Sequence, residues 1–247
     1  MESLSIIIPC YNEGEKLLSN ISKIKTFIFS SFENDLDFEI IIVNDGSTDN
    51  SKKIFEDYCK QDSLCKFITY DINKGKGYAV REGIKSSTKE VVVFMDADLS
   101  TDITALLDVY ENIGGTHIII GSRRHPKSIL IIPQGKRRRF VGKMCSLITN
   151  FLMSFNISDT QCGFKAFKGS VARELVLRQT INRFAFDVEL LYIGYLNGYV
   201  IKEIPVIWEN DEDSKVKLVG SSFKFMRDLI KIKLNKKHYI YKKEAIA

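Results

Sequence analysis

The sequence predicts an α/β fold with three layers, in which helices cover both faces of a mainly parallel sheet. Short apolar runs alternate with segments of helical periodicity over residues 4–123. Residues 91–95, VVVFM, are apolar without alternation, which is typical of a central strand buried on both faces. The 247 residues are enough to bury one large core without disulfides or a structural metal.

The first crossover unit is predicted from residues 4–45. Residues 4–9 and 38–45 are short apolar runs and predict two strands. Residues 13–32 lie between them and predict a helix with one apolar face. The unit is therefore β-α-β, and its crossover should be right-handed. The apolar face of the helix consists of Leu17, Ile21, Ile24 and Ile28.

The alternation of helix and strand continues along the first half of the chain. Residues 51–60 and 75–87 predict two more crossover helices. Residues 66–71 and 116–123 predict strands, in addition to the strand that begins at Val91. No internal repeat, low-complexity segment or linker rich in Pro, Gly or Ser interrupts the pattern.

Polar side chains follow each of the first four predicted strands. Glu13 follows the first and Asp45 ends the second, while Lys74 follows the third and Asp96 and Asp98 follow the fourth. Because ligands of open α/β sheets bind at the carboxyl ends of the strands, we expect these side chains to line one cleft. Paired carboxylates suit Mg²⁺ or Mn²⁺, which bridge phosphates. The expected ligand is a nucleoside diphosphate.

Composition and missing motifs disfavour several classes of protein. The five cysteines form no C-x-x-C pair, which disfavours a zinc knuckle or a disulfide framework and favours a reducing cytoplasm. No phosphate-binding G-x-x-x-x-G-K-[ST] or G-x-G-x-x-G loop follows the first strand, so an ATPase and a dinucleotide dehydrogenase are disfavoured. The net charge is only +5, from 36 basic and 31 acidic residues, and no nucleic-acid motif is present. We also expect neither a signal peptide nor a membrane span, since no apolar stretch approaches about 20 residues.

Seven motifs in order carry a resemblance to a known family. They are SIIIPCYNE, IIVNDGSTDNS, NKGKGYAVREGI, MDADLST, GSRRH, DTQCGFKAF and FAFDVELL. Together they resemble the family 2 glycosyltransferases with a GT-A fold, the nucleotide-diphospho-sugar transferase type, over residues 4–235. Within that family the chain is most similar to the polyprenyl-phosphate sugar synthases, and above all to the dolichyl-phosphate β-glucosyltransferases. Pointers to the glucosyl branch are DLST, DTQCGFK, FAFDVELLY and the late IPVIWENDEDSKV.

The resemblance implies roles for residues of the donor side. Asp45 would accept a hydrogen bond from the N3–H of the base, and Lys74 and Arg81 would close the nucleotide site. Asp96 would contact the ribose or support the metal, and Asp98 would bind a Mg²⁺ or Mn²⁺ ion that bridges the diphosphate. The nucleoside pocket would be lined by Pro9, Tyr11 and Glu13.

The resemblance also implies an acceptor side in the second half of the chain. Basic residues form two clusters there, in GSRRHPK and QGKRRRF. Arg123, together with Arg138 or Arg139, would grip a lipid phosphate, and the choice between the last two stays open. An arginine fork suits phosphate oxygens. Asp159 would act near the acceptor as a catalytic residue alongside Asp98. In FDVELL, Asp187 and Glu189 are expected to hold the wall of the active site, with contact to the sugar as the alternative for Asp187.

Two segments suggest contact with a membrane surface. Residues 129–133 are apolar and precede the basic run, and a stripe follows at helical spacing. Its members are Phe140, Met144, Leu147, Phe151 and Phe155. Core packing is the alternative explanation of such a stripe. Residues 211–247 repeat the pattern as a basic amphipathic segment, with Phe225, Leu229 and Ile232 against lysines. We therefore expect a catalytic domain over residues 1–210, amphipathic helices after it, and a peripheral location on the cytoplasmic face of a membrane.

The implied activity is an inverting transfer of a hexose to a polyprenyl or dolichyl phosphate. Glucose from UDP-glucose is the expected donor sugar, and the product would be β-linked. A family 2 glycosyltransferase that uses a saccharide hydroxyl as acceptor, in cell-surface polysaccharide synthesis, is the alternative. A nucleotidyltransferase would need a phosphate-gripping loop where PCYNEGEK stands, and a non-catalytic nucleotide-binding module would tolerate the loss of Asp98.

Overall fold

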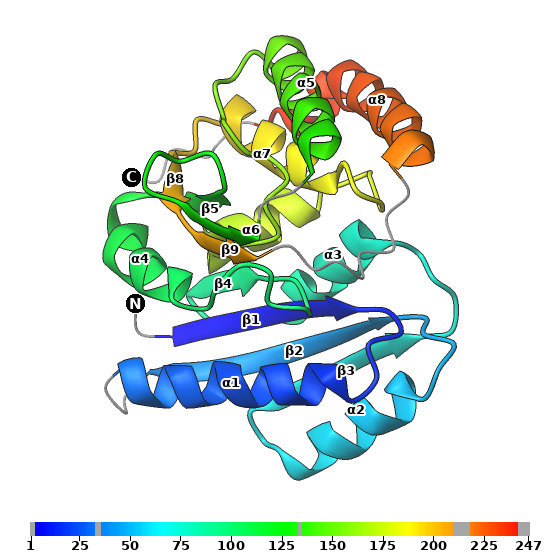
Figure 1. The fold of residues 1–247 in the computed structure, drawn as a ribbon, viewed down its shortest axis with the longest axis vertical. Helices are drawn as coiled ribbons and strands as arrows, with labels where there is room; N and C mark the ends of the chain where they lie inside the picture. Colours follow the sequence, from blue (N-terminus) through cyan, green and yellow to red (C-terminus); the bar gives the residue numbers. More distant parts are fainter. Residues whose placement is uncertain (1–2, 33–35, 133–134, 210–217, 242–247) are drawn as a thin grey trace.

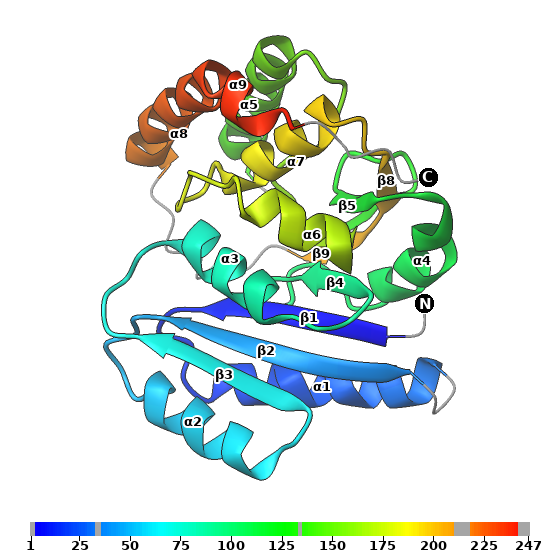
Figure 2. The same cartoon turned by 180° about the vertical axis from the view of Figure 1, so that it is seen from behind.

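A computed structural model gives the fold shown in Figures 1 and 2. It describes residues 3–32, 36–132, 135–209 and 218–241, except for the side chains of residues 136–141 and 218–222. Within the described chain, no helix has both the length and the apolar composition needed to cross a bilayer.

The centre of the molecule is a seven-stranded sheet with the order β3-β2-β1-β4-β7-β5-β8. All its neighbouring strands are parallel except β7, which is antiparallel to both β4 and β5. The predicted mainly parallel sheet is therefore confirmed. The strand bounds are β1 Ser3–Cys10, β2 Asp37–Asp45, β3 Cys65–Tyr70, β4 Val91–Phe94, β5 Ile118–Ser122, β7 Lys165–Lys168 and β8 Ile201–Pro205.

Alternate side chains of the buried strands enter two different cores, which confirms the three layers. Ile6 and Ile8 of β1 pack into one core, whereas Ile7 between them packs into the other. Figure 1 is viewed from the side of α1, and Figure 2 from the side of α3. The first core is covered by α1 Lys16–Ser31, α2 Ser51–Gln61 and α4 Ala105–Asn112. The second is covered by α3 Lys76–Ser86, α6 Gly169–Val176 and α7 Phe186–Leu196.

A second, two-stranded sheet was not predicted. It pairs β6 Ile129–Ile132 with β9 Ile207–Glu209 in parallel. Residues 129–132 form β6, and their apolar side chains are exposed, so the predicted contact of residues 129–133 with a membrane surface stays a prediction. The pairing joins segments far apart in sequence, and no local pattern reports such a partner.

The helices at the top of Figure 1 extend the second core beyond the sheet. α5 Lys136–Met153 and α8 Leu218–Leu234 lie side by side in both views, and α9 Lys236–Tyr239 follows α8. Phe225, Leu229 and Ile232 of α8 are at most 6% exposed and pack into that core. The expectation that these three face lipid is wrong, because the globular core covers them.

Candidate active site at the carboxyl ends of the strands

The first four strands are parallel neighbours, so their carboxyl ends meet at one edge of the sheet. Asp45 is the last residue of β2, and Asp96 lies two residues beyond β4. Hydrogen bonds join Asp45 to the loop after β3, and an ion pair joins Asp96 to Lys76 at the end of that loop. The structure thus brings together the donor-side residues that the sequence placed at strand ends.

Asp45 anchors the loop between β3 and α3. Its Oδ1 accepts from the backbone N–H of Lys74 at 2.8 Å, and its Oδ2 accepts from that of Gly75 at 2.9 Å. Gly75 has a φ of 106°, which favours glycine at this turn. Asp45 is 5% exposed. Because a carboxylate can accept about four hydrogen bonds, it keeps capacity for a ligand N–H.

Lys74 and Arg81 flank an aromatic pair beside this loop. The Nζ of Lys74 lies 4.4 Å from the ring centre of Tyr78 and 5.2 Å from that of Tyr70. The guanidinium of Arg81 lies 4.7 Å from the Tyr78 ring, and its Nη1 donates to the carbonyl of Gln179 at 3.2 Å. Both predicted cations are therefore held next to aromatic faces beside the loop that Asp45 anchors.

The β1 side of the site contains the remaining predicted nucleoside residues. Pro9 is buried in β1, Tyr11 is 39% exposed just after the strand, and Glu13 is half-buried. Burial raises the pKa of the Cys10 thiol, and so do the nearby carboxylates of Glu13, Asp49 and Asp45. Glu13 and Asp45 come at the carboxyl ends of β1 and β2, which are parallel neighbours, so both belong to the same edge of the sheet.

The turn that carries Asp96 and Asp98 is held by three hydrogen bonds. The buried Nδ2 of Asn20 in α1 donates to the carbonyl of Ala97 at 2.8 Å. The N–H of Leu99 donates to the Asp96 carbonyl at 3.2 Å, and the N–H of Ser100 donates to Asp98 Oδ1 at 2.9 Å. Leu99 has a φ of 54°, a rare conformation for a bulky residue that often occurs at functional sites. The sequence analysis did not identify Asn20. Its polar side chain, next to the apolar face of a predicted helix, was the available signal.

Lys76 is a second residue that the sequence analysis missed. Its Nζ forms an ion pair with Asp96 Oδ1. Burial would lower the pKa of Lys76, but the charges of Asp96 and Asp187 outweigh burial and raise it. The lysine therefore stays charged and lies between acids of the site. Its position as the first residue of α3, six residues beyond the end of β3, was the available signal.

The acceptor-side loop lies against the carboxylate of Asp96. A Cβ atom at Gly163, in the DTQCGFK motif, would be 1.9 Å from Asp96 Oδ2. Only glycine leaves space for the carboxylate at this position. The DTQCGFK motif, which resembles an acceptor site, is thus in direct contact with the MDADLST motif, which resembles a metal site.

Arg123 and Asp159 form a two-bond ion pair in that acceptor region. The Nε of Arg123 donates to Asp159 Oδ2 at 2.6 Å, and its Nη2 donates to Oδ1 at 2.8 Å. The guanidinium also lies 5.4 Å from the ring of Trp208 in β9. Burial would raise the pKa of Asp159, but the charge of Arg123 outweighs burial and the pKa is lowered. Two of the five guanidinium N–H donors are used in this pair, and the others can serve a second anion.

Arg138 and Arg139 belong to the first turns of α5, where side chains are outside the described part of the structure. Their predicted contact with phosphate stays a prediction.

A second ion pair is buried in the wall behind Asp96. Lys165 is fully buried, and its Nζ donates to Asp187 Oδ1 at 2.8 Å and to the Cys162 carbonyl at 2.6 Å. Asp187 is thus held in a buried ion pair, and its expected place in the wall of the active site stays a prediction. Burial raises the pKa of the Cys162 thiol, which makes it a poor nucleophile.

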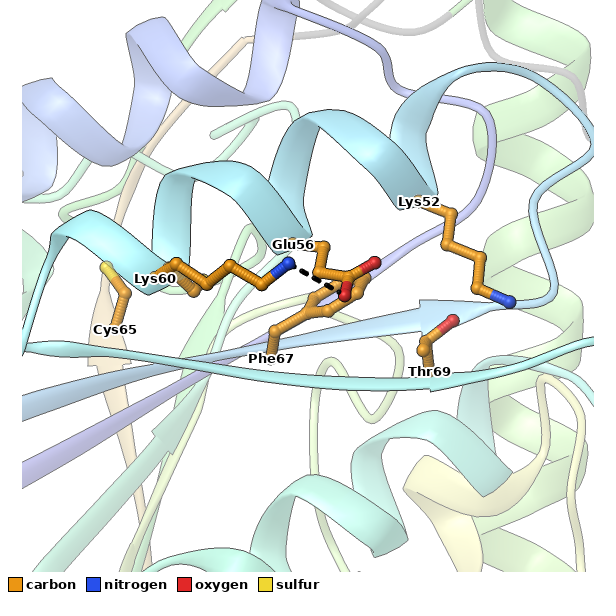
Figure 3. A pocket seen from close by; sticks show the side chains of 7 residues that line it. Lys52, Glu56, Lys60, Cys65, Phe67 and Thr69 are labelled. Atoms are coloured by element: carbon orange, nitrogen blue, oxygen red, sulfur yellow. Dashed lines mark ion pairs between the residues drawn. The ribbon is translucent and has the colours of Figure 1, made fainter.

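A hollow between α2 and β3 lies away from these residues (Figure 3). Its two lysines are already paired, Lys60 with Glu56 and Lys52 with Asp71, each at 3.0 Å. The hollow therefore offers no converging charge for a ligand. It is lined by Lys52, Glu56, Cys59, Lys60, Cys65, Phe67 and Thr69.

The family comparison covers most of the chain. Residues 5–176 match the family described as Glycosyl transferase family 2. A dolichyl-phosphate β-glucosyltransferase of Dictyostelium discoideum is 33% identical over 240 residues, which are 93% of this chain and 73% of the relative. The chain belongs to glycosyl transferase family 2. The human dolichyl-phosphate β-glucosyltransferase is 32% identical over 244 residues, 94% of this chain and 75% of the relative.

Solved structures show that this family 2 glycosyltransferase has the GT-A fold. The glucosyl-3-phosphoglycerate synthase of Mycobacterium tuberculosis, in complex with Mn²⁺, UDP-glucose and glycerol 3-phosphate, superposes with a TM-score of 0.61. The match covers 98% of this chain and 82% of that protein at 14% sequence identity. The predicted family and fold are both confirmed.

Proposed function

We propose that the protein transfers glucose from UDP-glucose to a dolichyl or polyprenyl phosphate, with inversion at the sugar C1, on the cytoplasmic face of a membrane. The proposal is supported by the relatives named dolichyl-phosphate β-glucosyltransferase, which are about a third identical over most of their length. Within the structure, the observation that carries it is the contact between Asp96 and Gly163, because this contact joins the donor side to the loop of Asp159.

The residues present fit a divalent cation that arrives with the donor. Asp96 and Asp98 are half-buried carboxylates of one turn. Among the described residues, no three His, Cys, Asp or Glu side chains gather into a metal cage. Mg²⁺ and Mn²⁺ in nucleotide sites are commonly held by one or two carboxylates plus substrate phosphates. A bound ion would neutralise charge on the departing diphosphate.

The protein's own groups account for donor binding and acceptor orientation. Asp45 accepts a base N–H, the Tyr70–Tyr78 pair and its cations lie beside the base, and Lys76 supplies positive charge next to Asp96. Because a phosphate oxygen is anionic at neutral pH, it can attack C1 without a strong general base. Asp159 holds Arg123 in place, and the unused N–H groups of Arg123 orient the acceptor phosphate.

The decisive test is a panel of nucleotide sugars with short polyprenyl phosphates, read by product mass. We expect transfer from UDP-glucose with Mg²⁺ or Mn²⁺, and none in the presence of a chelator. Polyprenol without its phosphate should be inert. Transfer to free oligosaccharides in place of the lipid phosphate would instead support the saccharide-acceptor alternative.

Arg123→Lys tests the acceptor assignment, because it keeps the charge beside Asp159 and loses the fork. We expect transfer to fall by about 10- to 100-fold, the range for one or more lost charge-assisted hydrogen bonds. UDP binding, measured by calorimetry, should be unchanged. Arg124→Lys is the matched control, since Arg124 Nη1 donates to the Ser158 carbonyl and not to Asp159. Loss of UDP binding in parallel with transfer would contradict the assignment.

Exposed apolar side chains on two neighbouring helices support contact with a lipid surface. On α5, Met144, Leu147 and Phe151 of the predicted stripe are 43%, 55% and 84% exposed. On α8, Phe223 is 78% exposed. Apolar side chains next to lysines are typical of helices that lie in the headgroup region. Phe155 lies beyond the end of α5 and is buried, and the side chain of Phe140 is outside the described residues.

A further inference from the structure

We propose that Glu189 and Tyr239 are positioning residues, through which the C-terminal helices hold the donor loop in its binding geometry. This inference rests on the proposed function, because it takes the loop at residues 73–77 to bind the nucleotide of the donor. Neither group is among the residues proposed to contact the donor or the acceptor.

Glu189 is fully buried in the first turns of α7 and accepts four hydrogen bonds. Its Oε1 accepts from the N–H and the Oγ1–H of Thr180, at 2.8 and 2.6 Å. Its Oε2 accepts from the N–H of Ile181 at 2.8 Å. The fourth donor is the hydroxyl of Tyr239, at 2.5 Å. A buried carboxylate in this setting fixes the backbone of residues 180 and 181.

The loop that Glu189 fixes, residues 179–182, packs against the first turn of α3. Gln179 Nε2 donates to the carbonyl of Gly77 at 2.8 Å, and the N–H of Tyr78 donates to the carbonyl of Asn182 at 3.0 Å. A Cβ at Gly75 would be 2.5 Å from the Asn182 oxygen, so the loop touches the backbone of the donor turn. The same turn donates to Asp45 and contains Lys76.

α7 itself makes a second contact with the first turn of α3. A Cβ at Gly77 would be 2.6 Å from the Cβ of Phe186, which is the first residue of α7. Phe186 and Glu189 belong to one turn of this helix. A shift of α7 or of its loop would therefore move the first turn of α3, where Lys76 meets Asp96.

Tyr239 connects this unit to the C-terminal helices. The residue is fully buried, ends α9 and packs edge-to-face on Tyr192 of α7. Its carbonyl accepts from Asn197 Nδ2 at 2.8 Å. Burial and the charge of Glu189 raise the pKa of Tyr239, so its hydroxyl stays a donor. The C-terminal helices are thus joined to the loop at residues 180 and 181 by the bond between the Tyr239 hydroxyl and the Glu189 carboxylate, and Asn235 Nδ2 adds a bond to Thr180 Oγ1 at 3.4 Å.

Tyr239→Phe in the full chain removes that bond and touches no residue of the site. We expect the Kd for UDP in the presence of Mn²⁺ to rise by about 3- to 10-fold, the effect of one lost hydrogen bond. The KM for polyprenyl phosphate should not change. Hydrogen exchange of the segment 73–78 should become faster. A role in stability alone would lower the melting temperature and leave the Kd unchanged.

Tyr241→Phe is the matched control, two residues away. Its hydroxyl bonds to that of Tyr199 at 3.2 Å, and its ring, which the substitution keeps, stacks on Arg178. This variant should bind UDP as the wild type does. The coupling is overturned if Tyr239→Phe binds UDP and exchanges segment 73–78 like the wild type. A wild-type protein that binds no uridine nucleotide overturns the proposed function instead.

Discussion

At the scale of single residues, the site depends on how closely groups can approach. The Asp96 carboxylate occupies the space in which any other residue at position 163 would place its Cβ. It also pairs with Lys76. Glycine is thus required at position 163 because a carboxylate needs the volume, not because the backbone has a positive φ.

Gly163→Ala should displace Asp96 and weaken the proposed donor site. We expect Mn²⁺-dependent UDP binding and glucosyl transfer to fall by at least about 10-fold, because a metal-supporting carboxylate must move. Calorimetry and a transfer assay measure the two effects. Gly114→Ala is the control, since its Cβ would meet nothing within 4 Å. Equal binding by both variants would contradict the placement of Asp96.

The Arg123–Asp159 pair should make stability depend on pH in the acid range. The pKa of Asp159 is lowered from 3.8 by Arg123. A carboxyl whose pKa is lower in the folded state adds stability above its unfolded pKa, and that stability is lost as pH falls through the folded pKa. Compared with Asp159→Asn, the wild type should be more stable by about 3 kcal/mol at neutral pH. Denaturant unfolding should show this difference shrinking below about pH 4. If the difference in free energy of unfolding between the wild type and Asp159→Asn stays constant with pH, the Asp159 carboxylate is not paired with Arg123.

At the scale of elements, close packing of α3 on the sheet fixes the donor loop. A Cβ at Gly83 would be 2.4 Å from Ile7 Cγ2 and 3.1 Å from Val43 Cγ2. These side chains belong to β1 and β2, which are neighbouring parallel strands of the sheet. Glycine at position 83 therefore lets α3 lie closer to the sheet than a residue with a side chain would.

Gly83→Ala should destabilise the fold, although alanine is the better helix former. Helix propensity favours alanine by about 1 kcal/mol. Overpacking against buried β-branched residues costs about 1–3 kcal/mol and outweighs that gain. Gly142→Ala in α5 is the matched control, because its Cβ would meet only Arg124 Nη2 at 3.7 Å. Thermal unfolding should show a lower melting temperature for Gly83→Ala and a higher one for Gly142→Ala. A stabilised Gly83→Ala would contradict the packing of α3.

At the scale of the whole molecule, the C-terminal helices have two different faces. Leu229 is fully buried in the core shared with α7, whereas the next residue, Ile230, is 53% exposed. The helix is therefore part of the folded unit on one face. We propose the other face, together with α5, for contact with lipid.

Leu229→Ala and Ile230→Ala should separate these two roles. The first should reduce the free energy of unfolding by about 2–5 kcal/mol, because it leaves a cavity in the core. The second should leave stability within about 0.5 kcal/mol and reduce binding to anionic vesicles. Denaturant unfolding and vesicle sedimentation measure the two effects. Unchanged vesicle binding by Ile230→Ala would argue against lipid contact at this face.

The sequence by itself determined the layers, the sheet class and the residues at the strand ends. Local periodicity carries this information, because buried strands need continuous apolar runs and covering helices need one apolar face. The first four strands and the helices between them were therefore predicted correctly. The family was also predicted correctly, from the resemblance of seven ordered motifs. Asp45 and Asp96 were placed in one site from their positions after neighbouring strands alone.

Only the tertiary structure decided which distant groups meet. The pairing of β6 with β9, the antiparallel β7 and the contacts of Lys76, Asn20 and Gly163 join segments far apart in the chain. The apolar face of α8 had the same pattern that a lipid-facing helix would have. It is buried because α5 and α7 lie against it, and periodicity reports that a face is apolar without reporting what covers it.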